Sequence, residues 1–587
     1  MSRLTLPTDR PRSEIMLTRR TSKLSHLLAL PALTLLAACQ ATTAKQENKL
    51  IVAVRVPANG DNPLGTADSR FIVMFADFLG SDGKPSNIQP YAQGMQVAAP
   101  SVPFGAARQI RVDVYNGDTQ PTSAIARGAT VPTDVYADSA ALELHPYVTR
   151  INTFAAAFGE PDASGNSPQT ELPAAHAATG VATLPNGKVV MAGGAVPKGS
   201  AKSAFDPASY ASFQSTIAVY DPDTRALDVA TDPAGQLATP RAFHTMAVGQ
   251  TVVAIVGGVE MDATNAPKAS NKIEFYNIAT GEVTSPTQTV PTMHFGRIAP
   301  TVIQMFDHQD YFLILGGQGN EDCPADPHAG ACGGNTWEIW HATGGFKAMG
   351  QLTTARWHHA GVRVPGPDGG FVMLIGGENT QGAVNKMEVV QFTVANGSVL
   401  VSDAMTNCPA DCPTTPAGFL WNPVSYDNQP TRIWPAALFV ANATANYYHV
   451  YMIGGFNDVA HSSANKTVDV FDIVQSKIVA TKQLTNGRAA PSVAAVTSGP
   501  ATGQLLIAGG SDSDTNHLNS GEYLHEDDDG AGGVATNVDP IQNLLGDGGR
   551  ALGAAVGLNT GHVLIVGGAG GSPLTGRTDV VLWNPNY

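Results

Sequence analysis

The chain has 587 residues, of which 43% are hydrophobic and 14% charged, and it contains 61 glycines and 40 prolines. So few charges and so many turn-forming residues argue against a disordered or helical chain and indicate an all-β protein with short strands. The formal net charge of −15 disfavours binding to nucleic acid and to anionic lipid headgroups.

The N-terminus reads as an export signal. Arg19, Arg20 and Lys23 form a basic segment, and the apolar run 27–38 is too short to span a bilayer. The run ends Leu-Ala-Ala before Cys39, which resembles a bacterial lipobox. The resemblance implies that residues 1–38 are a lipoprotein signal peptide, that Cys39 carries lipid, and that residues 39–49 form a polar tether. We therefore expect an exported outer-membrane lipoprotein, on the periplasmic face or at the cell surface, held to the membrane through the lipid alone.

Four further cysteines fall in two proline- and aspartate-rich insertions. In an exported chain an even number of cysteines indicates disulfide bonds, and four cysteines allow three connectivities. Proximity in sequence favours two short pairings over the others, and a four-thiolate zinc site is disfavoured because the C-x-x-C spacing is missing. The favoured pairings are Cys323–Cys332 and Cys408–Cys412.

Residues 50–148 contain short apolar or alternating runs separated by turn-rich stretches. Five such runs within about a hundred residues are typical of a β-sandwich. We expect an N-terminal β-sandwich domain here, of immunoglobulin-like or related type.

From residue 189 onward the chain is organised by a repeat. Seven apolar runs end in a pair of glycines at intervals of 55–78 residues, which is the pattern of a repeat architecture and favours a β-propeller. Glycine tolerates positive φ, and no helix is expected after any pair, so we expect these glycines to serve the fold and not to bind phosphate. The runs occupy 189–194, 253–258, 312–317, 372–377, 450–455, 505–510 and 563–568.

Two further marks recur in most of the units. An arginine leads the first strand, and the third strand closes on an aromatic residue followed by a turn, as in the Tyr-Asp-Pro of residues 220–222. With the Gly-Gly pairs, these marks make residues 172–587 resemble the kelch family, which implies a seven-bladed propeller with four strands in each blade. The first unit has Pro173 where the arginine is expected, with His176 aligned to His244 and His359, and the family's tryptophan in the fourth strand is missing.

The last unit lacks a segment for its fourth strand, because the chain reaches Tyr587 directly after the third. A ring of sheets must close to cover its open edges. We therefore predict that residues 150–158, just before the first unit, supply the missing strand, and that the propeller comprises residues 149–587.

The repeat places six arginines at equivalent positions near one mouth of the expected channel. They could bind a carboxylate or sulfate, or they could hydrogen-bond backbone carbonyl groups of a neighbouring blade and set its register. A residue present in nearly every repeat usually serves the repeat, so residues beside the arginines in only some units are the stronger binding candidates. The candidate ligand-binding residues are Arg241, His244, Arg356, Trp357, His359 and Trp434.

These observations favour a binding protein of the cell envelope that takes a glycan, an envelope polymer or a protein partner at a propeller mouth. One alternative is a carbohydrate-active enzyme with its site in the channel, similar to an epimerase or mutarotase. A copper-radical oxidase is less favoured, because that chemistry implies a cysteine cross-linked to a tyrosine and all four non-lipidated cysteines have neighbours with which to form disulfides. A structural or adhesive surface protein is the third. No catalytic residue is identified, and we expect no cofactor and no metal.

Overall fold

The computed structural model describes residues 51–63, 71–75, 87–91, 105–115, 124–135, 142–283, 290–305, 309–320, 332–366, 369–394, 419–426, 429–442, 447–499, 501–528, 534–543, 545–546 and 548–586. The protein is all-β, with three single-turn 3-10 helices among the described residues: η1 (Pro207–Ser209), η2 (Pro233–Gly235) and η3 (Gly333–Asn335). No helix in this part of the chain is long and apolar enough to cross a membrane.

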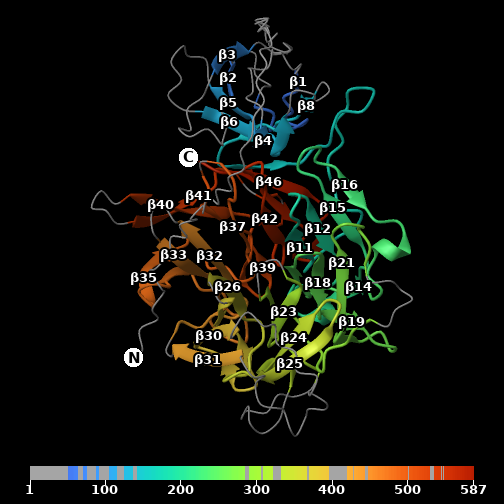
Figure 1. Ribbon diagram of the computed structural model, residues 1–587, viewed down its shortest axis with the longest axis vertical. Helices are drawn as coiled ribbons and strands as arrows, with labels where there is room; N and C mark the ends of the chain where they lie inside the picture. Colours follow the sequence, from blue (N-terminus) through green and yellow to red (C-terminus); the bar gives the residue numbers. More distant parts are fainter. Residues whose placement is uncertain are drawn as a thin grey trace, which may run out of the picture.

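The N-terminal strands lie together at one end of the molecule, blue in Figure 1. They form small sheets: β1 (Ile51–Val52) with β8 (Glu143–Leu144), β2 (Phe71–Phe75) with β3 (Asn87–Tyr91), β4 (Gly105–Arg108) with β7 (Thr133–Val135), and β5 (Arg111–Tyr115) with β6 (Ala124–Ala129) and β9 (Thr149–Arg150).

Seven antiparallel sheets follow, numbered here in chain order, and Figure 1 shows them arranged around a common centre. Sheets 1 to 3 are β11 (Gly180–Thr183), β12 (Val189–Ala192), β15 (Ile217–Tyr220), β16 (Leu227–Val229); β17 (Thr245–Val248), β18 (Val252–Val256), β21 (Ile273–Asn277); and β22 (Thr301–Gln304), β23 (Tyr311–Leu315), β24 (Thr336–His341), β25 (Gly345–Gln351). Sheets 4 and 5 are β26 (Ala360–Gly366), β27 (Gly369–Ile375), β30 (Met387–Val394), β31 (Phe419–Tyr426); and β32 (Ala436–Asn442), β33 (Tyr447–Ile453), β34 (Thr467–Asp472), β35 (Lys477–Gln483). Sheets 6 and 7 are β36 (Ser492–Ala495), β37 (Leu505–Ala508), β40 (Gly521–Asp528), β41 (Val534–Pro540); and β42 (Ala554–Gly557), β43 (Val563–Val566), β46 (Val580–Asn584), β10 (Thr153–Ala156).

Short hairpins follow the Gly-Gly pairs of five sheets. They are β13 (Ala195–Pro197) with β14 (Tyr210–Phe213), β19 (Val259–Met261) with β20 (Pro267–Ala269), β28 (Glu378–Asn379) with β29 (Gly382–Ala383), β38 (Ser511–Ser513) with β39 (Asn516–His517), and β44 (Ala569–Gly570) with β45 (Thr575–Gly576).

The Gly-Gly pairs join each sheet to the next. Both glycines of every pair have positive φ, and the second donates its N–H to a backbone carbonyl at the start of the following unit. The first such bond runs from Gly194 to Arg241 at 2.9 Å, and the last runs from Gly568 back to His176 at 2.9 Å. The same type of contact therefore links the seventh sheet to the first. The structural role expected of these glycines is confirmed.

A second set of backbone bonds surrounds the centre. The residue two positions after each arginine, or after His176, has φ between 44° and 55° although none is glycine. Six of these residues donate an N–H to the carbonyl of the equivalent residue in the preceding unit. The left-handed residue also breaks the strand, so the first strand of each sheet begins after the arginine and not at it, as the sequence had suggested. The seven are Ala178, Phe243, Ala299, His358, Trp434, Ala490 and Leu552.

The predicted closing strand is confirmed. β10 pairs antiparallel with β46, in register from Thr153 opposite Asn584 to Ala156 opposite Val581. Just beyond it, the N–H of Ala157 donates to the carbonyl of Val580 at 3.0 Å. The seventh sheet thus takes its fourth strand from the segment that precedes the first sheet.

This closure can be tested with proline. Ala157→Pro removes the N–H that Val580 accepts and places a ring at a fully buried position, so we expect it to lower the free energy of unfolding by about 2–4 kcal/mol. Urea unfolding of the full-length protein measures this loss. Ala157→Gly keeps the N–H and serves as the control; a loss as large as that of the proline variant would contradict the role of the bond.

Candidate functional site

The six arginines are buried inside their own sheets. Each is at most 2% exposed, and each pairs with a carboxylate, which lies on the third strand of its own sheet in five cases and directly before that strand in the case of Asp579. Each also donates to the carbonyl of the first glycine of its own Gly-Gly pair. The pairs are Arg241–Glu274, Arg297–Glu338, Arg356–Glu388, Arg432–Asp469, Arg488–Glu522 and Arg550–Asp579.

This arrangement favours the structural alternative for Arg241 and Arg356, with one difference from the expectation. The guanidinium groups bind carbonyls of their own sheet, and it is the arginine backbone carbonyl that contacts the preceding unit. Neither guanidinium group faces solvent or the centre of the ring of sheets, so neither is available to an anionic ligand in this structure.

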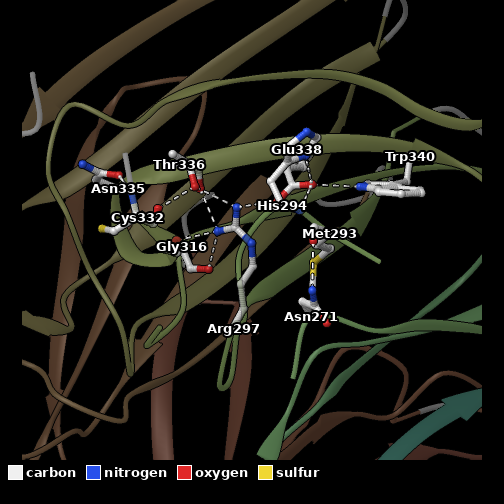
Figure 2. Close-up of polar contacts among 11 residues, drawn as sticks. Asn271, Met293, His294, Arg297, Gly316, Cys332, Asn335, Thr336, Glu338 and Trp340 are labelled. Carbon is white, nitrogen blue, oxygen red and sulfur yellow. Dashed lines mark hydrogen bonds and ion pairs between the residues drawn. The ribbon is translucent and has the colours of Figure 1, made fainter. Parts of the chain in front are cut away.

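Figure 2 shows the most elaborate of these pairs, around Glu338. Arg297 Nη2 lies 3.0 Å from one oxygen of Glu338, while Trp340 Nε1 and His294 Nδ1 lie 3.1 and 3.3 Å from the other. Burial acts to raise the pKa of Glu338, but the hydrogen bond from His294 and the charge of Arg297 outweigh it and lower that pKa. The same hydrogen bond raises the pKa of His294.

His176 occupies the arginine position of the first unit, which corrects the alignment made from sequence. Its carbonyl accepts from Gly568, and its Nδ1 lies 2.6 Å from the carbonyl of Gly193, where the other units place an arginine. The equivalent of His244 and His359 is therefore Thr179, whose hydroxyl bonds the carbonyl of Ala192 at 2.9 Å. Pro173 does not take the arginine's place.

His244 and His359 lie between neighbouring sheets. The Nε2 of His359 lies 3.0 Å from Thr301 Oγ1. The ring of His244 packs against Gly180 and Gly193 of sheet 1, so closely that a Cβ added to either glycine would come within 3 Å of the ring. Burial lowers the pKa of each histidine to about 3, and the nearby arginines add to the effect. Both are therefore neutral at physiological pH.

These depressed pKa values predict a loss of stability in acid. As the pH falls below about 6.5, these two histidines take up protons in the unfolded chain but not in the native protein. Each site therefore lowers the free energy of unfolding by about 1.4 kcal/mol for every unit that the pH falls, down to a pH of about 3. Urea unfolding at pH 7 and pH 5 measures the difference. We expect His244→Gln and His359→Gln each to reduce this difference in the free energy of unfolding between the two pH values. A double variant with the same difference as the wild type would contradict the prediction.

One end of the central axis is closed by a loop from sheet 1. Residues 198–209, between β13 and β14, reach the units of sheets 5, 6 and 7: Leu574 N–H donates to Ala201 O at 2.8 Å, and Ser203 Oγ donates to Asp514 at 2.6 Å. The buried ring of Phe205 packs 5.8 Å from Trp434 and 4.9 Å from Phe456, measured between ring centroids. Phe205 thus sits in an apolar layer to which six of the seven units contribute, all except that of sheet 4.

A cavity of about 180 Å³ lies on the axis next to this layer. Trp434 and Phe243 line it and also belong to, or pack against, the apolar layer. Trp434 stacks on His358 at 4.1 Å, and His358 Nδ1 in turn lies 2.7 Å from Glu378. The indole Nε1 of Trp434 is buried and has no hydrogen-bond partner among the described residues. We call this cavity, lined by Ala178, Thr179, Phe243, His244, Thr245, Ala299, Trp434, Ala490, Pro491, Leu552 and Gly553, the axial pocket.

The structure brings together two of the six candidate residues, His244 and Trp434, in the axial pocket. Trp357 packs instead against Cys332 and Ala355, away from the pocket. Phe243 and Phe205 were missed: Phe243 stands two residues after an arginine and was identifiable from the repeat, whereas Phe205 lies in a segment that does not repeat.

Several predicted features lie outside the described residues. They are the signal peptide, Cys39 and three of the four remaining cysteines, Cys323, Cys408 and Cys412. Lipidation and both disulfide pairings therefore stay predictions. Within the described residues no group of three or more histidine, cysteine, aspartate or glutamate side chains could hold a metal ion.

The similarity of this chain to known proteins lies in solved structures. No protein-family model matches the chain, and no curated protein matches it. A solved structure titled "Structure of YjhT" is similar to it at 13% sequence identity and a TM-score of 0.40, over 62% of this chain and 99% of that chain.

Proposed function

We propose that the seven sheets form a seven-bladed β-propeller of the kelch type, preceded by an N-terminal β-sandwich. The proposal is supported by the seven Gly-Gly bonds that return to the first unit, by the six arginine–carboxylate pairs, five of them at equivalent positions, and by the β10–β46 pairing. The lipobox at Cys39 supports the further proposal that the protein is exported and held at the outer membrane by lipid.

Within this architecture, we propose that the protein binds one uncharged sugar unit of an envelope glycan in the axial pocket. No charged side chain is among the residues that line it, so nothing there would balance an ionic ligand. The hydroxyls of Thr179 and Thr245 are already bonded to backbone carbonyls, whereas the ring nitrogens of Trp434 and His244 are buried and have no hydrogen-bond partner among the described residues. Apolar walls with a few polar groups are typical of small-molecule sites.

The observation that carries the proposal is the unpartnered indole nitrogen of Trp434. A buried donor without a partner costs about 1–3 kcal/mol, so such donors are rare in folded proteins unless water or a ligand meets them. At about 180 Å³ the pocket is smaller than sites for drug-sized ligands and would hold about six water molecules, which suits a single small ring.

Calorimetric titration of the full-length protein in detergent with glucose, galactose and N-acetylglucosamine tests this function. We expect one of them to bind, and Trp434→Phe, which keeps the ring but removes the donor, to weaken binding about threefold to tenfold. His341→Ala, at a histidine that does not line the pocket, is the control. The proposal fails if none of the sugars binds, or if Trp434→Phe binds as tightly as the wild type.

A further inference from the structure

A second cavity, of about 250 Å³, lies between the loops of sheets 6 and 7. It is formed by the β38–β39 hairpin and the residues after it, the turn that precedes Arg550, and the start of the β44–β45 hairpin. It shares no residue with the axial pocket. The polar side chains that matter here are Thr515, His517, Asn519 and Ser572.

One lining side chain of this cavity is already paired, since Asn516 Nδ2 donates to Asp512 at 2.8 Å, but the imidazole of His517 is not. His517 is only 8% exposed, and neither of its ring nitrogens has a partner within the described part of the chain. Burial lowers the pKa of His517, so the ring is neutral and offers one donor and one acceptor. Polar groups just outside the cavity are paired, by contrast: Asp514 accepts from Ser203 at 2.6 Å.

The remaining wall of the cavity is backbone. Gly548, Gly549 and Gly571 all have positive φ and carry no side chain that would fill the space. The guanidinium group of Arg577 holds this wall in place, because its Nε and Nη2 donate to the carbonyl of Gly549 at 3.1 and 2.7 Å. A ligand can therefore approach the chain closely here.

We propose that this cavity is a second binding site, for an uncharged, hydroxylated ligand such as one sugar unit of a glycan. The imidazole of His517, the amide of Asn519 and the hydroxyls of Thr515 and Ser572 each supply both a donor and an acceptor, which suits the hydroxyl groups of a sugar. No carboxylate and no cationic side chain lines the cavity, so neither a metal ion nor an anion is matched.

The site does not depend on the axial pocket. Two sugar sites on one molecule would bind a glycan polymer more tightly than either site binds a free sugar, because the second contact becomes intramolecular once the first is made.

The test is saturation-transfer NMR on the full-length protein, with glucose, galactose and N-acetylglucosamine as probes and Trp434→Phe present throughout to weaken the axial pocket. We expect a sugar to bind, and Asn519→Ala and His517→Gln each to weaken that binding about threefold to tenfold. His525→Gln, on β40 of the same sheet and outside the cavity, is the control.

Because His517 is buried, its substitution could disturb the fold, so the circular dichroism spectrum of each variant must match that of the wild type. Asn519 is partly exposed, so Asn519→Ala tests sugar binding without a change in the buried core. Sugar binding that is unchanged in both variants would overturn the proposal, as would the absence of any sugar signal. Displacement of the sugar by sulfate at equal concentration would also overturn it, since the site would then select charge. If the Trp434→Phe protein binds the sugar as tightly as the wild type, and adding Asn519→Ala then weakens that binding, the result would support this site and reject the axial one.

Discussion

Replacing Glu338 with alanine is expected to lower the free energy of unfolding by about 3–5 kcal/mol, because the substitution leaves the guanidinium group of Arg297 buried without a counter-charge. Both side chains are fully buried, so water cannot replace the lost carboxylate. Trp340 and His294 lose their acceptor as well. Urea unfolding of the full-length protein, followed by circular dichroism, measures the change.

The chain contains a matched control for this prediction. Asp579 pairs with Arg550 two residues before the position in sheet 7 that is equivalent to Glu338, and its side chain is 31% exposed. Water can therefore reach the space left by Asp579→Ala, and we expect a smaller loss of about 1–2 kcal/mol. Equal losses in the two variants would show that burial of the pair does not determine its contribution.

The second large effect is expected at the Gly-Gly pairs. A Cβ on Gly454 would lie 1.9 Å from the carbonyl oxygen of Arg488, and the residue has φ of 59°. Gly454→Ala must therefore push sheet 5 away from the backbone of the next unit, and we expect a loss of more than about 4 kcal/mol in the free energy of unfolding, or failure to fold.

Two other glycines separate the causes of this loss. Gly345 has φ of 65° but no atom within 4 Å of an added Cβ, so Gly345→Ala measures the conformational cost alone, about 1–2 kcal/mol. Gly199 has neither a positive φ nor a close neighbour, and Gly199→Ala should change stability by less than about 0.5 kcal/mol. If Gly454→Ala were no more destabilising than Gly345→Ala, the contact with Arg488 would not be tight.

The features that could be predicted from the sequence are those that recur in each unit of the repeat. The Gly-Gly pairs and the missing fourth strand led to the β10–β46 pairing, because each sheet needs the same set of strands. The position of His176 was misjudged because sequence shows only that a histidine stands near the expected place. Its role follows from a backbone carbonyl that accepts from Gly568, which no side-chain pattern records.

The candidate site was predictable only in part, for the same reason. His244 and Trp434 stand out because they differ between units, and both line the axial pocket. Phe205 comes from a loop without equivalents elsewhere, and its contact with Trp434 joins residues 229 positions apart. His517 and Asn519 face glycines of another unit across a cavity, a juxtaposition that only the three-dimensional arrangement creates.

The pairing of β10 with β46 also has a consequence for how the protein folds. The two strands are about 430 residues apart in the chain, so the contact that completes the seventh sheet has a very high contact order and forms late. At ordinary rates of synthesis, about 20–90 s separate the emergence of β10 from the ribosome from that of its partner. During that time β10 has no antiparallel partner, and sheet 1 has no seventh sheet beside it. A chain built in this way completes its fold only after its last strand is available.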